Sequence, residues 1–112
     1  MKIEQPEISV VVCAYTENRW QDLIEAVKSL KNQTRKPHEV IIVIDHNDSL
    51  FRRSEAEFTS ERITVIKNHH PRGLSGARNS GISIATGDVI AFMDEDAIAA
   101  PDWLYQTSQF FR

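Results

Sequence analysis

The stretch Gly87-Asp88-Val89-Ile90-Ala91-Phe92-Met93-Asp94-Glu95-Asp96 decides the predicted fold of this 112-residue chain. Its apolar middle, from Val89 to Met93, is typical of a strand buried on both faces in a parallel sheet under helices. Three carboxylates end the run, and open α/β folds bind ligands where their strands end. In extended backbone Asp94 and Asp96 point the same way and repel each other unless a cation or a donor group lies between them. The stretch therefore predicts a site for a metal ion or a polyol.

Three further runs of β-branched and apolar residues predict strands at 8–14, 40–44 and 63–66. Helices are predicted between and after the strands at 20–30, 50–60, 74–85 and from Pro101 onward. For the first helix we expect Asn18 as N-cap, with Gln21 completing a capping box, and for the third we expect a glycine cap at Gly87. Strands alternating with helices require right-handed parallel crossovers. We therefore predict one domain over residues 1–112, a three-layer α/β/α sandwich with a mainly parallel sheet.

Composition excludes several classes of function. The net charge is −3 with both signs scattered, so the chain has no basic surface for nucleic acid and no polybasic membrane patch. No apolar run is long enough to span a membrane, and Met1 to Glu7 is polar, unlike a signal peptide. The single cysteine, Cys13, lies in a predicted buried strand and is interpreted as a small core residue in a reducing compartment. We expect a cytoplasmic location.

Polar motifs follow the strands. Acidic residues follow three of the four strands, at Glu17, at Asp45 with Asp48, and at Asp94 to Asp96, and in a parallel sheet these strand ends share one edge. The glycines between Gly73 and Gly81 match neither the dinucleotide fingerprint nor a P-loop. They either bind phosphate at a helix start or allow the helix to pack closely on the sheet.

Two other groups of polar residues allow more than one interpretation. Adjacent His69 and His70 favour a structural or surface role over zinc, because no second ligand pair at zinc spacing exists. Arg72 and Arg78 could contact a diphosphate, since arginine matches phosphate oxygens, or they could be solvated surface residues.

Four pieces in this order resemble family 2 glycosyltransferases of the GT-A fold. They are Val-Val-Val-Cys-Ala-Tyr-Thr-Glu-Asn, Ile-Val-Ile-Asp, Gly-Leu-Ser-Gly-Ala-Arg-Asn-Ser-Gly and Gly-Asp-Val-Ile-Ala-Phe-Met-Asp-Glu-Asp, and the resemblance runs from about Ile8 to Leu104. It implies a Rossmann-like nucleotide-binding half that binds a nucleotide-diphospho-sugar donor, and a UDP-sugar is the donor we expect first. It also implies inverting sugar transfer with Mg²⁺ or Mn²⁺ as cofactor.

The resemblance also implies roles for individual residues. Tyr15, Thr16 and Glu17 line the nucleotide pocket, and Asp45 hydrogen-bonds the base. The D-x-D pair and the helix arginine complete the set. Asp96 is the direct metal ligand, Asp94 is a metal or ribose contact, and Arg78 lines the nucleotide side of the cleft. Many members have a second aspartate after the one matched by Asp45, whereas this chain has His46, so the base preference stays open.

No residue matches the general base that inverting transfer requires. The chain therefore resembles a donor-binding half without the acceptor half, and an open sheet edge leads us to expect association, such as a homo-oligomer. Two alternatives remain: a non-catalytic module that binds a nucleotide or nucleotide-sugar, and a nucleotidyltransferase. The second would need a glycine-rich basic loop after the first strand, and Tyr15 to Arg19 contains no glycine.

Overall fold

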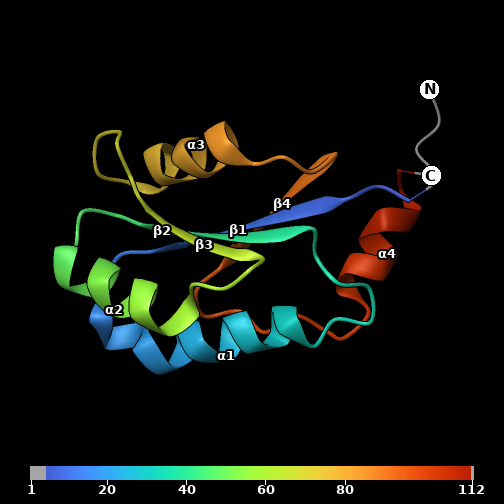
Figure 1. Ribbon diagram of the computed structural model, residues 1–112, viewed down its shortest axis with the longest axis horizontal. Helices are drawn as coiled ribbons and strands as arrows, with labels where there is room; N and C mark the ends of the chain where they lie inside the picture. Colours follow the sequence, from blue (N-terminus) through green and yellow to red (C-terminus); the bar gives the residue numbers. More distant parts are fainter. Residues whose placement is uncertain (1–4, 112) are drawn as a thin grey trace.

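The computed structural model describes residues 5–111, so residues 1–4 of the polar N-terminal stretch and residue 112 lie outside the described part. Its centre is a four-stranded sheet in the order β3-β2-β1-β4, in which every pairing is parallel (Figure 1). The strands are β1 (Ile8–Ala14), β2 (Glu39–Ile44), β3 (Ile63–Lys67) and β4 (Val89–Asp94). The predicted parallel sheet is confirmed.

Helices cover both faces of the sheet. Figure 1 shows α1 (Trp20–Lys31) and α2 (Asp48–Phe58) on one face and α3 (Leu74–Ile84) on the other. A short α4 (Trp103–Gln109) lies beyond the end of α1, where the backbone N–H of Leu104 donates to Gln33 Oε1 at 3.0 Å. The three-layer α/β/α sandwich is therefore confirmed. Within residues 5–111, no helix is long and apolar enough to cross a membrane.

Two apolar clusters fill the space between the layers. The larger lies between the sheet and α1, α2 and α4, and the smaller lies under α3, where it contains Val11, Ile41, Val43 and Ala77. Helix α3 approaches the sheet closely, because a Cβ placed on Gly81 would lie 2.5 Å from Val11 Cγ1. This supports the packing interpretation of Gly81.

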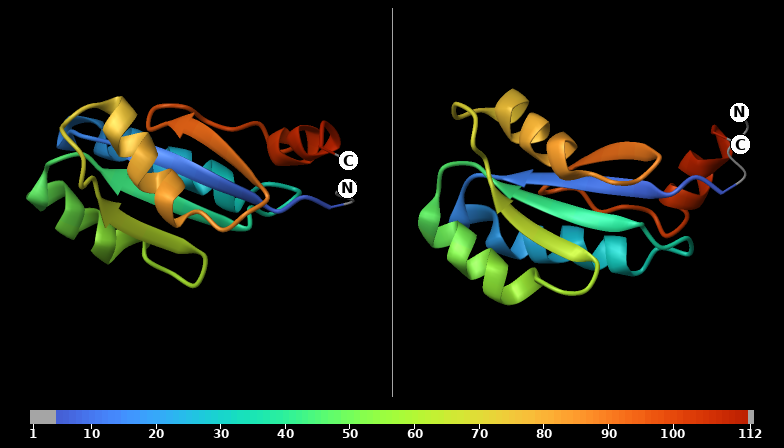
Figure 2. Two further views of the ribbon diagram at one scale, coloured as in Figure 1. Left: turned by 90° about the horizontal axis from the view of Figure 1, so that it is seen from above. Right: turned by 45° about the horizontal axis from the view of Figure 1, so that its top comes forward.

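The burial of β4 differs from the expectation. Val89, Ile90 and Ala91 are only partly buried and Phe92 is 38% exposed, so the prediction of a strand buried on both faces is wrong. The cause is its position: β4 is an outer strand that pairs only with β1, as both views in Figure 2 show. Helix α3 packs on β1 and β2 and leaves the outer part of β4 uncovered.

Three predicted helix boundaries are also wrong. Thr16, not Asn18, caps the first turn: its Oγ1 accepts from Asn18 N at 3.1 Å, and this opens a 3-10 turn (Glu17–Arg19) that leads directly into α1. Helix α3 ends without a glycine cap, because its C-cap is Ala85 in extended backbone. Gly87 is needed for a different reason, since a Cβ there would lie 2.6 Å from Ser9 Oγ. Pro101 precedes α4 rather than lying in its first turn.

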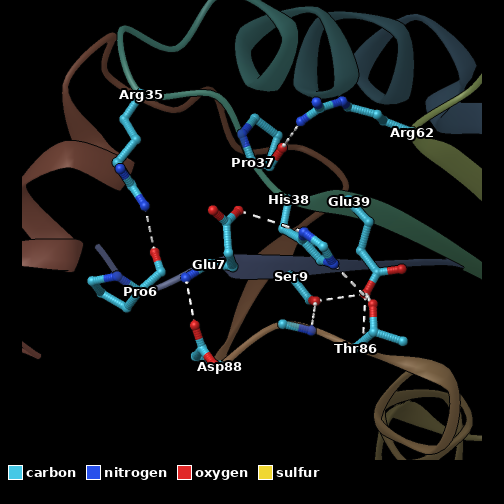
Figure 3. A network of polar contacts seen from close by, with 11 residues as sticks. Pro6, Glu7, Ser9, Arg35, Pro37, His38, Glu39, Arg62, Thr86 and Asp88 are labelled. Carbon is cyan, nitrogen blue, oxygen red and sulfur yellow. Dashed lines mark hydrogen bonds and ion pairs between the residues drawn. The ribbon is translucent and has the colours of Figure 1, made fainter. Parts of the chain in front are cut away.

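The amino edge of the sheet is closed by a polar network (Figure 3). The carboxylate of Glu39 accepts hydrogen bonds from Ser9 Oγ at 2.6 Å, Thr86 N at 2.7 Å and Thr86 Oγ1 at 3.0 Å. Partial burial alone would raise the pKa of Glu39, but these hydrogen bonds outweigh it and lower the pKa below its ordinary value. The backbone N–H of Glu7 donates to Asp88 Oδ2 at 2.9 Å. These contacts fix the start of β1 beside the start of β4.

Candidate functional site

A pocket of about 500 Å³ opens at the carboxyl edge of the sheet, within the usual range for small-molecule sites. It lies where the strand order reverses, because the chain runs from β1 outward to β3 and then returns to place β4 on the other side of β1. Open α/β sheets bind ligands at this switch point. The lining comes from the ends of β1, β2 and β4 and from the start of α3: Cys13, Ala14, Tyr15, Arg19, Asp45, His46, Arg72, Gly73, Leu74, Ala77, Asp94, Glu95 and Asp96.

Asp94 and Asp96 are brought together in this pocket, as the sequence predicted. Both residues are exposed, and within residues 5–111 neither carboxylate accepts a hydrogen bond or forms an ion pair. Four carboxylates and two arginines line the pocket, so its charge is negative and favours a cation over a bare anion. No group of three or more histidine, cysteine, aspartate or glutamate side chains in the described part of the chain is arranged to hold a metal ion.

Asp45 lines the pocket and also holds it together. Its Oδ1 accepts from Asn68 Nδ2 at 2.9 Å and its Oδ2 accepts from the backbone N–H of Gly73 at 2.9 Å. Gly73 is the N-cap of α3 and has a φ of 135°, a conformation that favours glycine. Asn68 in turn accepts from Ser80 Oγ at 2.8 Å. The ends of β2 and β3 and the start of α3 are thus joined through one buried carboxylate.

Of the three residues after β1 that were predicted to line the nucleotide pocket, only the first does so. The Tyr15 side chain is 55% exposed and lines the pocket. Thr16 is engaged as the cap of the 3-10 turn, and Glu17 forms an ion pair with Arg53 at 3.9 Å. Neither Thr16 nor Glu17 lines the pocket. Glu17 and Asp48 follow the ends of the parallel strands β1 and β2, as expected, but neither lines the pocket.

Only one of the two arginines near α3 lines the pocket. Arg72 lines the pocket, and its Nη2 donates to the carbonyl of His46 at 3.4 Å. Arg78 does not line it; its guanidinium lies 5.1 Å from the ring centroid of Phe92 on β4. Burial raises the pKa of the Cys13 thiol, and Arg78 is still close enough for its charge to oppose that rise.

Sequence reasoning missed an ion pair inside the pocket. Arg19 Nη1 lies 3.4 Å from Glu95 Oε1, and the Glu95 side chain is only 5% exposed. Burial raises the pKa of Glu95, and the neighbouring charge of Arg19 opposes that rise. The sequence offered only a weak signal, an arginine and a glutamate that each follow a predicted strand.

Two further residues that line the pocket, His46 and Cys13, have side chains that can react or bind a ligand. His46 has a φ of 53°, and its Nε2 lies 2.7 Å from the carbonyl of His70, so this nitrogen carries a proton and donates to that carbonyl. Cys13 is partly buried: it packs against the smaller core cluster, as the sequence indicated, and it also lines the pocket. Burial raises the pKa of its thiol to about 11. His69 and His70 are exposed, and their polar contacts are made by backbone atoms.

Comparison with known proteins gives a consistent family. The profile of Glycosyl transferase family 2 matches residues 9–112. A glucosyl-dolichyl phosphate glucuronosyltransferase from Haloferax volcanii is 39% identical over 99 residues, covering 88% of this chain and 32% of that protein. The β-1,3-glucosyltransferase WfgD from Escherichia coli, named for UDP-Glc and a diphosphoundecaprenol-linked sugar, is 30% identical over 91 residues, covering 81% of this chain and 35% of that protein.

Solved structures show the same fold. The mannosyltransferase PcManGT from Pyrobaculum calidifontis, solved with GDP-Man and Mn²⁺, superposes with a TM-score of 0.71 at 23% identity over 95% of this chain and 32% of that one. S. aureus TarS 1–349 with UDP-GlcNAc gives a TM-score of 0.74 at 24% identity, covering 93% of this chain and 30% of that one. The present chain spans about a third of the length of the curated relatives it matches.

Proposed function

The chain belongs to glycosyl transferase family 2, and from this premise we propose that its pocket binds a nucleotide-diphospho-sugar donor for inverting sugar transfer. The observation that carries the proposal is the position of Asp94 and Asp96 in a pocket at the switch point of the sheet. Both carboxylates are exposed and have no protein partner within residues 5–111. Relatives and fold neighbours named for UDP-Glc, UDP-GlcNAc and GDP-Man support a nucleotide-sugar donor. We propose a UDP-sugar as the donor, and a GDP-sugar is the alternative donor to compare with it in binding experiments.

The donor set fits a hard divalent cation. Mg²⁺ and Mn²⁺ prefer oxygen ligands, and Mg²⁺ commonly uses one or two carboxylates together with substrate phosphates. We propose that Asp96 binds the ion directly and that Asp94 contacts the ion or the ribose. When bound, the ion would neutralise the diphosphate and stabilise it as a leaving group. Such a site uses two carboxylates and does not require the cluster of three that is lacking within residues 5–111.

The remaining residues would bind and orient the nucleotide. Tyr15 offers an exposed aromatic ring beside the pocket, and Asp45, although both of its oxygens accept protein hydrogen bonds, has lone pairs left for a base N–H. Arg72 lines the pocket, and Arg78 lies just outside it, near Phe92. We propose that both arginines face the diphosphate. A cytoplasmic location and association through an exposed sheet edge or an uncovered apolar surface stay predictions.

We assign no general base among residues 5–111. Apart from the proposed metal pair, the carboxylates lining the pocket are Asp45, which accepts two hydrogen bonds, and Glu95, which is buried against Arg19. This favours a second candidate, a module that binds the donor without catalysing transfer. Release of UDP from UDP-glucose by the purified chain, with and without added acceptor, is the test. We expect donor binding without turnover, and turnover would show that a residue of this chain serves as the base and would argue against the non-catalytic module.

Thermal denaturation tests the donor site. At ten times its dissociation constant, UDP with Mn²⁺ should add about 1.4 kcal/mol to the free energy of unfolding, or roughly 6 °C in Tm for a domain of this size. Asp96→Asn should abolish the shift, and Asp22→Asn, which alters an exposed carboxylate on α1, should preserve it. The proposal fails if neither UDP nor GDP raises the Tm in the presence of Mn²⁺.

A further inference from the structure

One buried charge in the pocket has no part in the proposed chemistry. The carboxylate of Glu95 is 5% exposed, its Oε1 contacts Arg19 Nη1 at 3.4 Å, and its Oε2 is buried without a hydrogen-bond partner in the described part of the chain. A buried carboxylate with an unsatisfied oxygen costs free energy. Its presence between two exposed aspartates therefore calls for a compensating role.

Arg19 links two walls of the pocket. Its guanidinium lies 5.8 Å from the ring centroid of Tyr15, which follows β1, and 3.4 Å from Glu95, which follows β4. The two strands are hydrogen-bonded neighbours, with Cys13 opposite Asp94, although Arg19 and Glu95 are 76 residues apart in the sequence. A single side chain thus contacts both the aromatic wall and the acidic loop.

The direction of Glu95 matters for its neighbours. Because Glu95 is buried against Arg19, the residues on either side of it, Asp94 and Asp96, are left exposed in the pocket. Rotation of the loop that released Glu95 to solvent would also turn these two carboxylates. Charge neutralisation by Arg19 further reduces the repulsion among three consecutive acidic residues.

We infer that Arg19 and Glu95 form a positioning pair that couples the orientation of Tyr15 to that of the Asp94–Asp96 loop. The consequence for ligand binding rests on the proposed function; the coupling itself does not. Neither residue need touch the ligand. Loss of either partner should let the aromatic wall and the acidic loop move independently, and ligands that need both should bind less tightly.

Fluorine NMR tests the coupling without any ligand. The chain has two tyrosines, so labelling with 3-fluorotyrosine gives two signals, and Tyr105→Phe assigns the signal of Tyr15. Glu95→Gln is nearly equal in size and keeps a side-chain oxygen for the nearby backbone N–H of Tyr15, but it removes the charge that pairs with Arg19. It should shift the Tyr15 signal, and Arg19→Lys should shift that signal less than Arg19→Gln. The matched control is Arg53→Gln, since Arg53 also contacts a carboxylate at 3.9 Å and an aromatic ring at 4.0 Å, both outside the pocket. An unchanged Tyr15 signal in Glu95→Gln would overturn the coupling.

Binding of UDP with Mn²⁺, measured by calorimetry well below the Tm of each variant, tests the consequence. Arg19→Gln and Glu95→Gln should each weaken binding about tenfold, in the range known for residues that orient metal ligands. The double variant should bind no more weakly than either single variant, because both changes break one link. Full affinity in folded single variants, or additive losses in the double variant, would overturn the positioning role. If the unaltered chain binds no UDP with Mn²⁺, the proposed function fails, and the fluorine signals still decide the coupling.

Discussion

Replacing Asp45 by asparagine should destabilise the whole domain, because this carboxylate joins three elements. Its two oxygens accept from Asn68 Nδ2 and from Gly73 N, each at 2.9 Å, and the residue is 8% exposed. An asparagine has one oxygen and one NH₂ group, so in either orientation one of these two donors faces another donor. Loss of one hydrogen bond to a charged acceptor in a buried position costs about 2–3 kcal/mol. This corresponds to a fall in Tm of roughly 8–12 °C.

The assay is thermal and urea denaturation of Asp45→Asn beside Asp96→Asn. Both variants remove one charge from the same pocket, but Asp96 is exposed and its carboxylate has no protein partner within residues 5–111. Asp96→Asn should therefore change the free energy of unfolding by less than about 0.5 kcal/mol. Equal Tm values for the two variants would refute the structural role of Asp45. The comparison also matters for function, because a loss of nucleotide binding in Asp45→Asn counts as a base contact only at temperatures where the variant is folded.

Three further predictions concern packing, reactivity and pH. In urea denaturation, Gly81→Ala should destabilise the chain by about 1–3 kcal/mol despite the higher helix propensity of alanine, because the new Cβ meets Val11 Cγ1 at 2.5 Å. Asn79→Ala on the exposed face of α3 should not destabilise it, and equal effects of the two variants would contradict the close approach of α3 to the sheet. Iodoacetamide should alkylate Cys13 slowly at pH 8, since a pKa of about 11 in place of 9.0 lowers the thiolate fraction about 100-fold; a rate in the folded chain equal to that in urea would disprove this. Burial raises the pKa of Glu95 above 4.5, so the folded state binds this proton more tightly than the unfolded state, and the free energy of unfolding falls as the pH rises from 4.5 through the folded pKa. Between pH 4 and pH 7, Glu95→Gln should therefore gain stability relative to the unaltered chain. A change of the opposite sign would contradict the raised pKa.

Much of the fold follows from local patterns in the sequence. Apolar runs such as 8–14 and 40–44 predict the central strands because both of their faces are covered, and burial then follows from composition alone. The same reasoning failed for β4, whose run is equally apolar, because burial of an outer strand depends on which elements pack beside it. Helix ends were less predictable: Thr16 and Asn18 are both good caps, and only the backbone conformation decides between them.

The candidate site was predictable in part. Asp94 is the last residue of β4 and Asp96 lies two residues beyond it, so their place at the sheet edge depends only on strand direction. The pairing of Arg19 with Glu95 depends on β4 lying next to β1, and the sequence does not reveal this order. The hydrogen bonds of Asp45 were hidden for the same reason, since its partners come from β3 and α3.

The position of β4 also has a consequence for the order in which the chain assembles. The pairings β1–β2 and β2–β3 join neighbouring segments, whereas β4 must return to β1, as the contact between Glu7 and Asp88 across 81 residues shows. Closing a longer loop costs more entropy, so we expect β1 to β3 to form first during synthesis and β4 to add last. Strand β4, which is added last, should also be the first to detach on partial unfolding. The pocket, which needs the end of β4, would then exist only in the complete domain, and a ligand bound there would hold the last strand in place.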